Sequence, residues 1–185
     1  MIFIDEKKKR ICHIIIFIIF IVISYMAFCK IKSTVPVLAM QYRFIIINQT
    51  NSIPMGLYIR IPTWYLHNGD YVIYQPVKEV EAIAVQRGWM TKGQLFLKRI
   101  AALEGETFNI DLDKSAFYAN GRYLGQIYTT DGTGKEMPIY NIGEKIVPKG
   151  YFLPYGMNPK SYDGRYTGYV PTENIYFKLV PVFTL

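Results

Sequence analysis

The sequence has very few of the residues from which covalent cross-links and metal sites are built. Its 185 residues include two cysteines, Cys12 and Cys29, and two histidines, His13 and His67. If the segment between the cysteines is helical, they lie about 25 Å apart, which is too far for a disulfide bond. No Cys or His pair has the spacing of a metal site. We therefore expect no disulfide, no metal ion and no cofactor.

The scarcity of histidine also limits the catalytic chemistry. A Ser-His-Asp triad outside the N-terminal apolar run would have to use His67. This residue lies in the segment Trp64-Tyr-Leu-His-Asn-Gly-Asp70, whose composition is typical of a surface turn. If the chain is a hydrolase, its general base is therefore expected to be a residue other than histidine.

One long segment contains no charged residue. Residues 11–29 run from Ile11 to Cys29 without Asp, Glu, Lys or Arg. A helix of this length crosses a hydrocarbon layer of about 30 Å. A cleaved signal peptide is the alternative, but its apolar region is usually shorter, about 7–15 residues, and ends in small residues. Because Met26-Ala-Phe-Cys29 is a poor cleavage site, we expect an uncleaved transmembrane anchor at 11–29.

The charges beside this segment predict its orientation. Four basic residues, Lys7–Arg10, precede it, whereas Lys30 and Lys32 follow it. The positive-inside rule then predicts a cytoplasmic tail at 1–10 in a single-pass protein of the cytoplasmic (inner) membrane. Residues 33–185 would form an exported domain on the periplasmic or extracellular side. This domain has fifteen basic and twelve acidic residues without a basic stripe, so we expect lipid as a partner and not nucleic acid.

The exported part is expected to be mainly β, a small barrel-like domain with one helix at Val77–Trp89. Short apolar segments bounded by Gly, Pro, Asn and Asp predict strands. They are Arg43–Ile47, Leu57–Ile61, Tyr71–Tyr74, Leu95–Ala101, Thr107–Ile110, Ala116–Tyr118, Arg122–Leu124, Tyr151–Leu153 and Ile175–Val180. Asn120-Gly121 predicts a tight hairpin turn. The sixteen tyrosines and eleven phenylalanines fit packing in the core. Insertion of some of them into the lipid interface is the alternative.

Lys98 is the candidate base. It lies in an apolar strand, where alternation places it on the same face as Phe96 and Ile100. Apolar neighbours disfavour the charged amine and lower its pKa, so that a neutral amine can accept a proton from a serine hydroxyl. On this segment alone, an ordinary strand lysine that extends into solvent is the simpler interpretation.

Two further segments carry candidate polar residues. Ser52 lies between a strand and a turn in which Pro54 and Gly56 constrain the backbone, so the hydroxyl can be exposed; an ordinary polar turn is the alternative. Asp163 and Arg165 are two residues apart and would share one face of an extended segment, where they could pair. A solvated ion pair of little energetic value is the alternative there.

Taken together, three motifs resemble those of the signal peptidase I family. They are Asn48-Gln-Thr-Asn-Ser-Ile-Pro-Met-Gly-Leu-Tyr58, Leu97-Lys-Arg-Ile-Ala-Ala-Leu-Glu-Gly105 and Ser161-Tyr-Asp-Gly-Arg-Tyr-Thr-Gly168. The resemblance runs from about Ile45 to Gly168 and includes the N-terminal anchor. It implies a serine peptidase with Ser52 as nucleophile and Lys98 as general base. It also implies that Thr50 and the Ser52 N–H stabilise the oxyanion.

The resemblance implies roles for further residues. Ser161 would hydrogen-bond the catalytic lysine, and Asp163 and Arg165 would form a supporting pair. The substrate would add as a strand along Ile45, Ile46 and Ile47 and along Leu95, Phe96 and Leu97.

Within this family, Ser-x-Pro-x-Gly-Leu-Tyr resembles the conjugative-transfer, TraF-type branch. That branch implies pilin maturation, with the pilin's own N-terminus able to resolve the acyl-enzyme, and components of conjugation or type IV secretion as partners. The chain also departs from housekeeping members at Met157, Gly164 and Thr167, and Met157 leaves Arg99 without the acidic partner common there. A general signal peptidase that cleaves secreted preproteins is one alternative. An inactive β-domain of a secretion apparatus is the other, although such a scaffold would need neither Ser52 nor Lys98.

Overall fold

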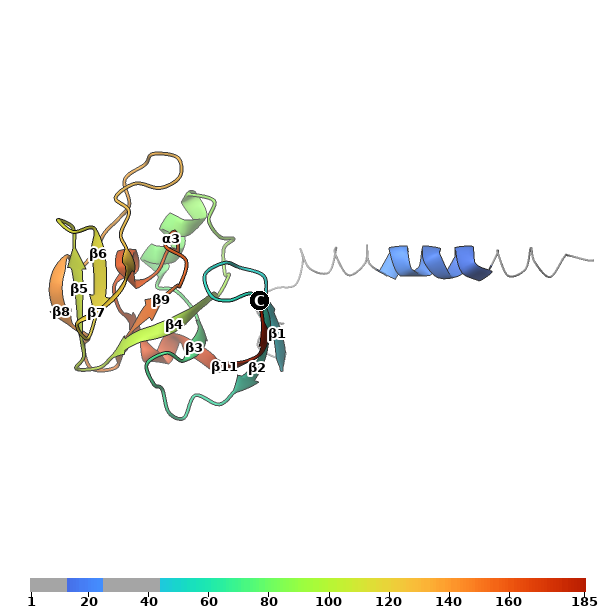
Figure 1. Ribbon diagram of the computed structural model, residues 1–185, viewed down its shortest axis with the longest axis horizontal. Coiled ribbons are helices and arrows are strands. Elements are labelled where there is room, and N and C mark those ends of the chain that lie inside the picture. Colours follow the sequence, from blue (N-terminus) through green and yellow to red (C-terminus); the bar gives the residue numbers. More distant parts are fainter. Residues whose placement is uncertain (1–12, 25–43) are drawn as a thin grey trace, which may run out of the picture. The chain divides into compact units, whose positions relative to one another are not determined.

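The computed structural model describes residues 13–24 and 44–185. The chain divides into two units, Met1–Met40 and Gln41–Leu185. Within the first unit, residues 13–24 form an α-helix (Figure 1). All its side chains are exposed. This helix is the central part of the expected anchor at 11–29, whereas the expected tail at 1–10 and both cysteines lie outside the described residues. Among the described residues, no helix is both long enough and apolar enough to cross a membrane.

The second unit is mainly β, as expected. Its larger sheet has seven strands in the order β1-β2-β11-β3-β4-β9-β10, and its smaller sheet has four in the order β7-β6-β5-β8. The strands of the larger sheet are β1 (Ile45–Asn48), β2 (Gly56–Ile61), β3 (Tyr71–Tyr74), β4 (Phe96–Leu103), β9 (Tyr151–Tyr155), β10 (Val170–Pro171) and β11 (Ile175–Thr184). Those of the smaller sheet are β5 (Thr107–Asp111), β6 (Ala116–Ala119), β7 (Arg122–Gln126) and β8 (Gly143–Ile146).

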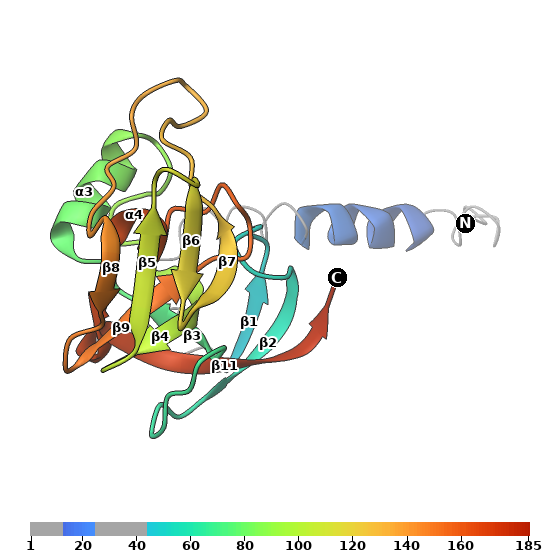
Figure 2. The same cartoon turned by 60° about the vertical axis from the view of Figure 1, so that its left-hand side comes forward.

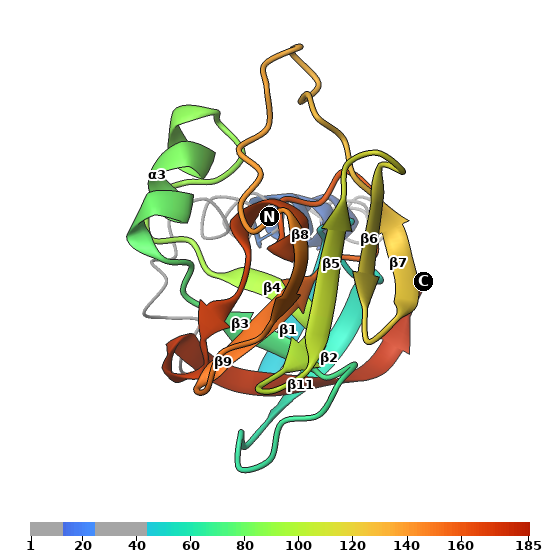
Figure 3. The same cartoon turned by 90° about the vertical axis from the view of Figure 1, so that its left-hand side faces the viewer.

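The larger sheet curls but does not close into a barrel. Every strand pair in it is antiparallel, and β1 and β10 are its two edges among the described residues. The long strand β11 lies between β2 and β3 and follows the curvature of the sheet (Figure 2). The smaller sheet lies on the side of β4 and β9 that is turned away from β1 and β2, and it faces the viewer in Figure 3. The expected barrel-like domain is therefore an open, half-barrel sheet with a second sheet packed against it.

The core fills the space between these sheets. Its largest buried cluster joins Ala102 of β4 and Leu153 of β9 to Phe108, Ile110 and Phe117 of the smaller sheet. A second cluster packs Val72, Tyr74, Ile100, Phe152 and Val170 within the larger sheet. The Tyr74 ring meets that of Phe152 edge-on at 5.2 Å between centroids, a favourable geometry for aromatic pairs. These aromatic residues therefore pack in the core, in agreement with the first of the two interpretations of their abundance.

Most predicted elements in the described region are present, with shifted ends. The helix α3 spans Lys78–Gln86, shorter than expected, because Arg87 is its C-cap and Gly88 has a positive φ of 71°. Asn120 and Gly121 form the hairpin turn with φ values of 51° and 71°. Leu95 was expected in a strand but precedes β4. The short elements β8, β10, the 3-10 helix η1 (Thr172–Asn174) and the helix α4 (Gly164–Thr167) were not predicted.

Candidate active site

Ser52 lies at the turn between β1 and β2. The turn starts after Asn48 and ends at Gly56, and the apolar Ile53 beside Ser52 is 2% exposed and anchors it in the core. The Ser52 carbonyl oxygen accepts a hydrogen bond of 2.6 Å from the N–H of Met157. The nucleophile candidate is thus tied both to the sheet and to the loop that carries Ser161.

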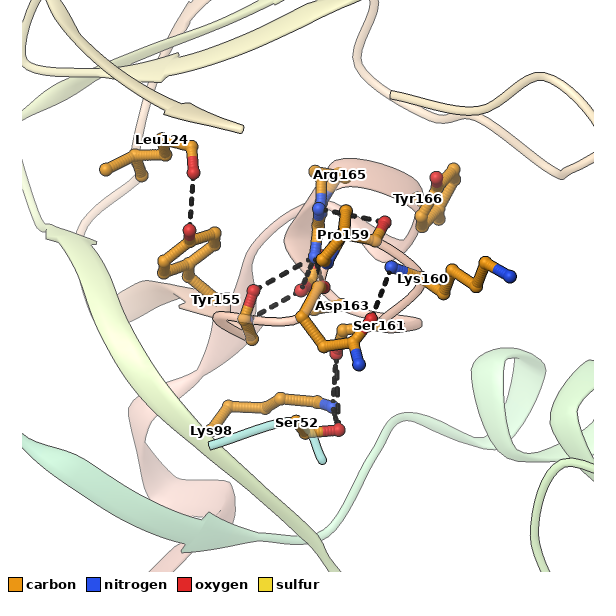
Figure 4. Close-up of polar contacts among 12 residues, drawn as sticks. Ser52, Lys98, Leu124, Tyr155, Pro159, Lys160, Ser161, Asp163, Arg165 and Tyr166 are labelled. Atoms are coloured by element: carbon orange, nitrogen blue, oxygen red, sulfur yellow. Dashed lines mark hydrogen bonds and ion pairs between the residues drawn. The ribbon is translucent and has the colours of Figure 1, made fainter. Parts of the chain in front are cut away.

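Lys98 reaches this serine from the middle of the larger sheet. It belongs to β4 and is paired with Val72 of β3. Its side chain is 5% exposed, and its Nζ lies 2.7 Å from Ser52 Oγ and 2.7 Å from Ser161 Oγ (Figure 4). The Ser161 Oγ is also 3.4 Å from Ser52 Oγ. The fold therefore brings Lys98 into contact with Ser52, 46 residues away in the chain, and with Ser161, 63 residues away.

The surroundings of Lys98 favour its neutral form. Its pKa is lowered from 10.5 to about 8, chiefly by burial; the nearby Asp163 raises the pKa, and Arg165 lowers it. Desolvation dominates because a buried ammonium loses its hydration. The Phe96 ring, 5.5 Å from Nζ, lies on the same face of β4, as alternation predicts. A large fraction of Lys98 is consequently neutral near pH 8, as a general base for a serine hydroxyl requires.

Asp163 and Arg165 form a buried ion pair next to Ser161 (Figure 4). Their exposures are 0% and 1%, and Arg165 Nη2 donates to Asp163 Oδ2 at 2.7 Å. The pairing was expected from an extended segment, but the segment is instead the start of α4. Asp163 caps this helix, since its Oδ1 accepts from Arg165 N at 3.1 Å and from Arg165 Nε at 2.9 Å. A cap places residues two apart within reach of each other through the helical turn and not through strand alternation.

Arg165 fixes the loop that carries Ser161. Its guanidinium donates to the carbonyl oxygens of Gly156, Asn158 and Pro159 at 3.0, 2.7 and 3.1 Å. The Asp163–Arg165 pair is therefore buried and hydrogen-bonded to the surrounding loop, and it is not a solvated ion pair. Removing one partner from such a pair leaves an uncompensated buried charge.

Gly156 was not singled out from the sequence, although Ser161 depends on it. A Cβ at this position would lie 2.1 Å from Ser161 Oγ and 3.0 Å from Asp163 Oδ2. Its N–H donates to Asp163 Oδ2 at 2.6 Å. The only sequence signal was a glycine five residues before Ser161, and nothing local shows that the two residues meet.

Thr50 is also close to Ser52, but its hydroxyl has a partner. The Oγ1 of Thr50 donates to Asn48 Oδ1 at 2.8 Å. Arg99 likewise has partners other than an acidic residue at position 157: its Nε donates to Gly69 O at 3.1 Å, and its guanidinium lies over the Tyr71 ring. His67 lies on the surface between β2 and β3, with a 73% exposed side chain.

The residues expected to bind substrate lie on two strands, except Leu95, which precedes β4 and is buried at 8% exposure. Ile45 and Ile47 are exposed on β1, at the edge of the larger sheet, whereas Ile46 between them is buried at 3%. Phe96 and Leu97 belong to the part of β4 that pairs with β3, and pairing with β9 begins only at Arg99. Both strands therefore present, in the described part of the chain, backbone edges without a neighbouring strand.

A buried lysine in contact with a serine hydroxyl is the arrangement expected of a serine hydrolase with a lysine base. Comparison with known proteins identifies the class. The pattern of the family described as signal peptidase, peptidase S26, matches residues 6–183. The chain therefore belongs to the S26 signal peptidase family, a family of serine peptidases.

Two relatives and one solved structure are similar to parts of the chain. The chain is 32% identical to a signal peptidase I of Leptolyngbya laminosa over 62% of this chain and 51% of that protein. It is 27% identical to the plasmid transfer protein TraF of Escherichia coli over 75% of this chain and 82% of TraF. A crystal structure of a signal peptidase I from Enterococcus faecalis aligns with 63% of this chain and 97% of that one, at 21% identity and a TM-score of 0.40. The chain spans about half the length of the signal peptidase it matches in Leptolyngbya.

Proposed function

We propose that the protein is a membrane-anchored serine endopeptidase of the signal peptidase I type, with a Ser52–Lys98 dyad. The observation that carries the proposal is the contact of 2.7 Å between the buried Lys98 Nζ and Ser52 Oγ. Ser161 and the Asp163–Arg165 pair support this contact through the bonds described above. The 11–29 segment would anchor the enzyme in the cytoplasmic membrane, with the catalytic domain on the far side.

The chemistry is acyl transfer. Neutral Lys98 takes the proton of the Ser52 hydroxyl while Ser52 Oγ attacks a peptide carbonyl. The Ser52 N–H and the Thr50 hydroxyl donate to the oxyanion. The protonated Lys98 then gives its proton to the leaving amine, which leaves an acyl-enzyme. Water or a second amine attacks this ester, Lys98 accepts the proton of the attacking group, and Lys98 returns that proton to Ser52 Oγ as the ester bond breaks.

The substrate is an exported, membrane-tethered protein with small residues near the cut. It adds as a strand between the exposed edge of β1 and the open part of β4, so that backbone hydrogen bonds hold it. The exposed Ile45 and Ile47 and the half-buried Phe96 and Leu97 would contact its side chains. This arrangement directs the scissile peptide toward Ser52 at the end of β1.

Within this activity, we favour maturation of a conjugative pilin or another transfer-system substrate. Two observations support this choice over general preprotein processing. The chain has the segment Pro54-Met-Gly-Leu-Tyr58 two residues after Ser52, and its similarity to TraF extends over 82% of that protein. Components of conjugation or type IV secretion would then be its partners. An amine tethered in the same substrate has a high effective concentration and can outcompete water in a closed site.

One experiment tests both the dyad and the branch. Full-length enzyme in membranes is incubated with a pilin precursor and, separately, with a signal-bearing preprotein, and products are weighed by intact-mass spectrometry. Wild type is expected to process the pilin to a circular form, one water lighter than the trimmed linear chain. Ser52→Ala, Lys98→Ala and Lys98→Arg are expected to give no product, since a guanidinium does not release its proton near neutral pH.

The outcomes separate the alternatives. Processing by Lys98→Arg, or loss of wild-type activity in EDTA, would contradict the dyad. Linear products only, with efficient cleavage of unrelated preproteins, would identify a general signal peptidase. No product from either substrate with the folded wild-type enzyme would favour an inactive structural domain.

A further inference from the structure

The side chain of Asn48 bridges the two arms of the turn that carries Ser52. Asn48 is the last residue of β1 and is 5% exposed. Its Oδ1 accepts from Thr50 N at 3.0 Å and from Thr50 Oγ1 at 2.8 Å, on the arm before Ser52. Its Nδ2 donates to Ile53 O at 3.2 Å and Pro54 O at 3.0 Å, on the arm after Ser52, and to Thr50 O at 3.0 Å.

These contacts use the full hydrogen-bonding capacity of the carboxamide. An asparagine side chain has one acceptor oxygen and two N–H donors, and here both ends are engaged with the same turn. The three carbonyl acceptors around Nδ2 also determine which end of the amide is nitrogen. The side chains of nearly the same shape cannot accept on one arm and donate on the other, since an ionised aspartate only accepts and a leucine does neither.

The buried Asn48 side chain therefore joins both arms of the turn. The Ser52 carbonyl oxygen accepts a hydrogen bond from the Met157 N–H. The residues before and after Ser52 are hydrogen-bonded to Asn48. Tyr58 adds a further constraint, since its hydroxyl donates to Pro54 O at 2.6 Å. The contact between Ser52 Oγ and Lys98 requires a fixed position of the Ser52 backbone, because Lys98 itself is fixed in β4.

Asn48 also controls the hydroxyl of Thr50. Because Oδ1 can only accept, the hydrogen between these two oxygens belongs to Thr50 Oγ1. For this hydroxyl to donate to an oxyanion, its hydrogen must rotate away from Asn48. Asn48 Oδ1 then still accepts the Thr50 N–H, so the rotation leaves no buried group without a partner.

We propose that Asn48 is a positioning residue of the active site, which sets the positions of Ser52 and of the Thr50 side chain. This role rests on the proposed serine peptidase function. Asn48 touches neither the reacting atoms nor the substrate, and it acts through Ser52 and Thr50. A displacement of the nucleophile of about 1 Å reduces catalysis about 100-fold, so the effect of losing Asn48 belongs in kcat.

The test compares Asn48→Ala with wild type in the full-length enzyme, using a peptide substrate. The acyl-enzyme burst counts active sites, so that kcat is expressed per competent molecule and loss of folded protein does not enter it. We expect kcat per site to fall about 30- to 100-fold, with KM changed less than about threefold. Asn174→Ala is the matched control, since its Nδ2 donates to a backbone carbonyl, that of Gln75 at 2.9 Å. It should retain wild-type kcat.

A double-mutant cycle with Thr50→Val tests the path of the effect. If Asn48 acts partly through the Thr50 hydroxyl, Asn48→Ala should cost much less in the Thr50→Val background than in wild type. A kcat per active site within threefold of wild type for Asn48→Ala would overturn the proposal, as would strictly multiplicative effects in the cycle. Ser52→Ala is measured in the same assay. If it remains active, the proposed function itself is wrong, whereas an inactive Ser52→Ala beside a fully active Asn48→Ala rejects only the role of Asn48.

Discussion

At the scale of single residues, the site depends on one lysine in an unusual environment. Lys98 is 5% exposed, and its partners are the two serine hydroxyls. Burial is the main reason for its lowered pKa of about 8, against an ordinary 10.5. Asp163 opposes this shift, but its carboxylate oxygens accept hydrogen bonds from Arg165 and Gly156. A large fraction of the Lys98 amine is therefore neutral near pH 8, while Asp163 remains paired with Arg165.

This environment predicts the pH dependence of activity. Only neutral Lys98 can accept the serine proton, so activity is lost as pH falls through the pKa of Lys98. We expect kcat/KM of the wild-type enzyme to rise about tenfold per pH unit below pH 8 and to level off above a midpoint of about 8. Initial rates between pH 6 and 10 measure this, with thermal unfolding followed over the same range as the control for folding. A flat profile, or a midpoint near the ordinary 10.5, would contradict the role of Lys98 as base.

At the scale of elements, the loop between β9 and α4 positions Ser161 against Lys98. Gly156 begins this loop, Arg165 ties down three of its carbonyls, and Asp163 caps α4. The loop is also joined to the Ser52 turn through the Met157 N–H. The two loops therefore form one unit although they come from distant parts of the chain.

This unit predicts a sensitive glycine. Gly156→Ala places a Cβ 2.1 Å from Ser161 Oγ and 2.6 Å from Ser161 Cβ, so Ser161 must move away from Lys98. We expect kcat/KM to fall about 10- to 100-fold, and this is measured by steady-state kinetics. Gly132→Ala is the control, because a Cβ there meets nothing within 4 Å. Equal activity of the two variants would show that the position of Ser161 is unimportant for catalysis.

At the scale of the whole molecule, two units of different chemistry follow each other in the chain. The first contains the apolar run at 11–29, and the second is a β-domain whose fifteen basic and twelve acidic residues nearly balance. If an uncharged segment of that length were helical throughout, it would be stable in a hydrocarbon layer, because all its backbone groups would be bonded internally. The four basic residues before it favour a cytoplasmic N-terminus.

This organisation predicts the topology. Protease added to intact spheroplasts should degrade the domain at 33–185 while a cytoplasmic marker protein stays whole. Immunoblotting with an antibody to the domain follows the loss. A domain that is protected in spheroplasts and digested only after lysis would place it on the cytoplasmic side and contradict the proposed orientation.

Some of these features follow from the sequence alone. Strands such as Tyr71–Tyr74 and the hairpin at Asn120-Gly121 were predicted because alternation and turn preferences are local properties of the backbone. Ser52, Lys98 and Ser161 could be selected from their motifs, and Lys98 also from its apolar strand. The match to the signal peptidase family spans residues 6–183, which include these motifs.

Other features were decided only by the tertiary structure. The cap that turns Asp163 and Arg165 into a buried pair, the need for glycine at position 156 and the bridge made by Asn48 join residues two to seven positions apart, but each depends on the path that the backbone takes in a packed loop. Hydrogen bonds and steric contacts act over a few ångströms, and these loops meet across long separations, such as the 109 residues between Ser52 and Ser161. Local sequence preferences contain no record of such meetings. The fold sets them when the curled sheet brings β4, the Ser52 turn and the β9–α4 loop together.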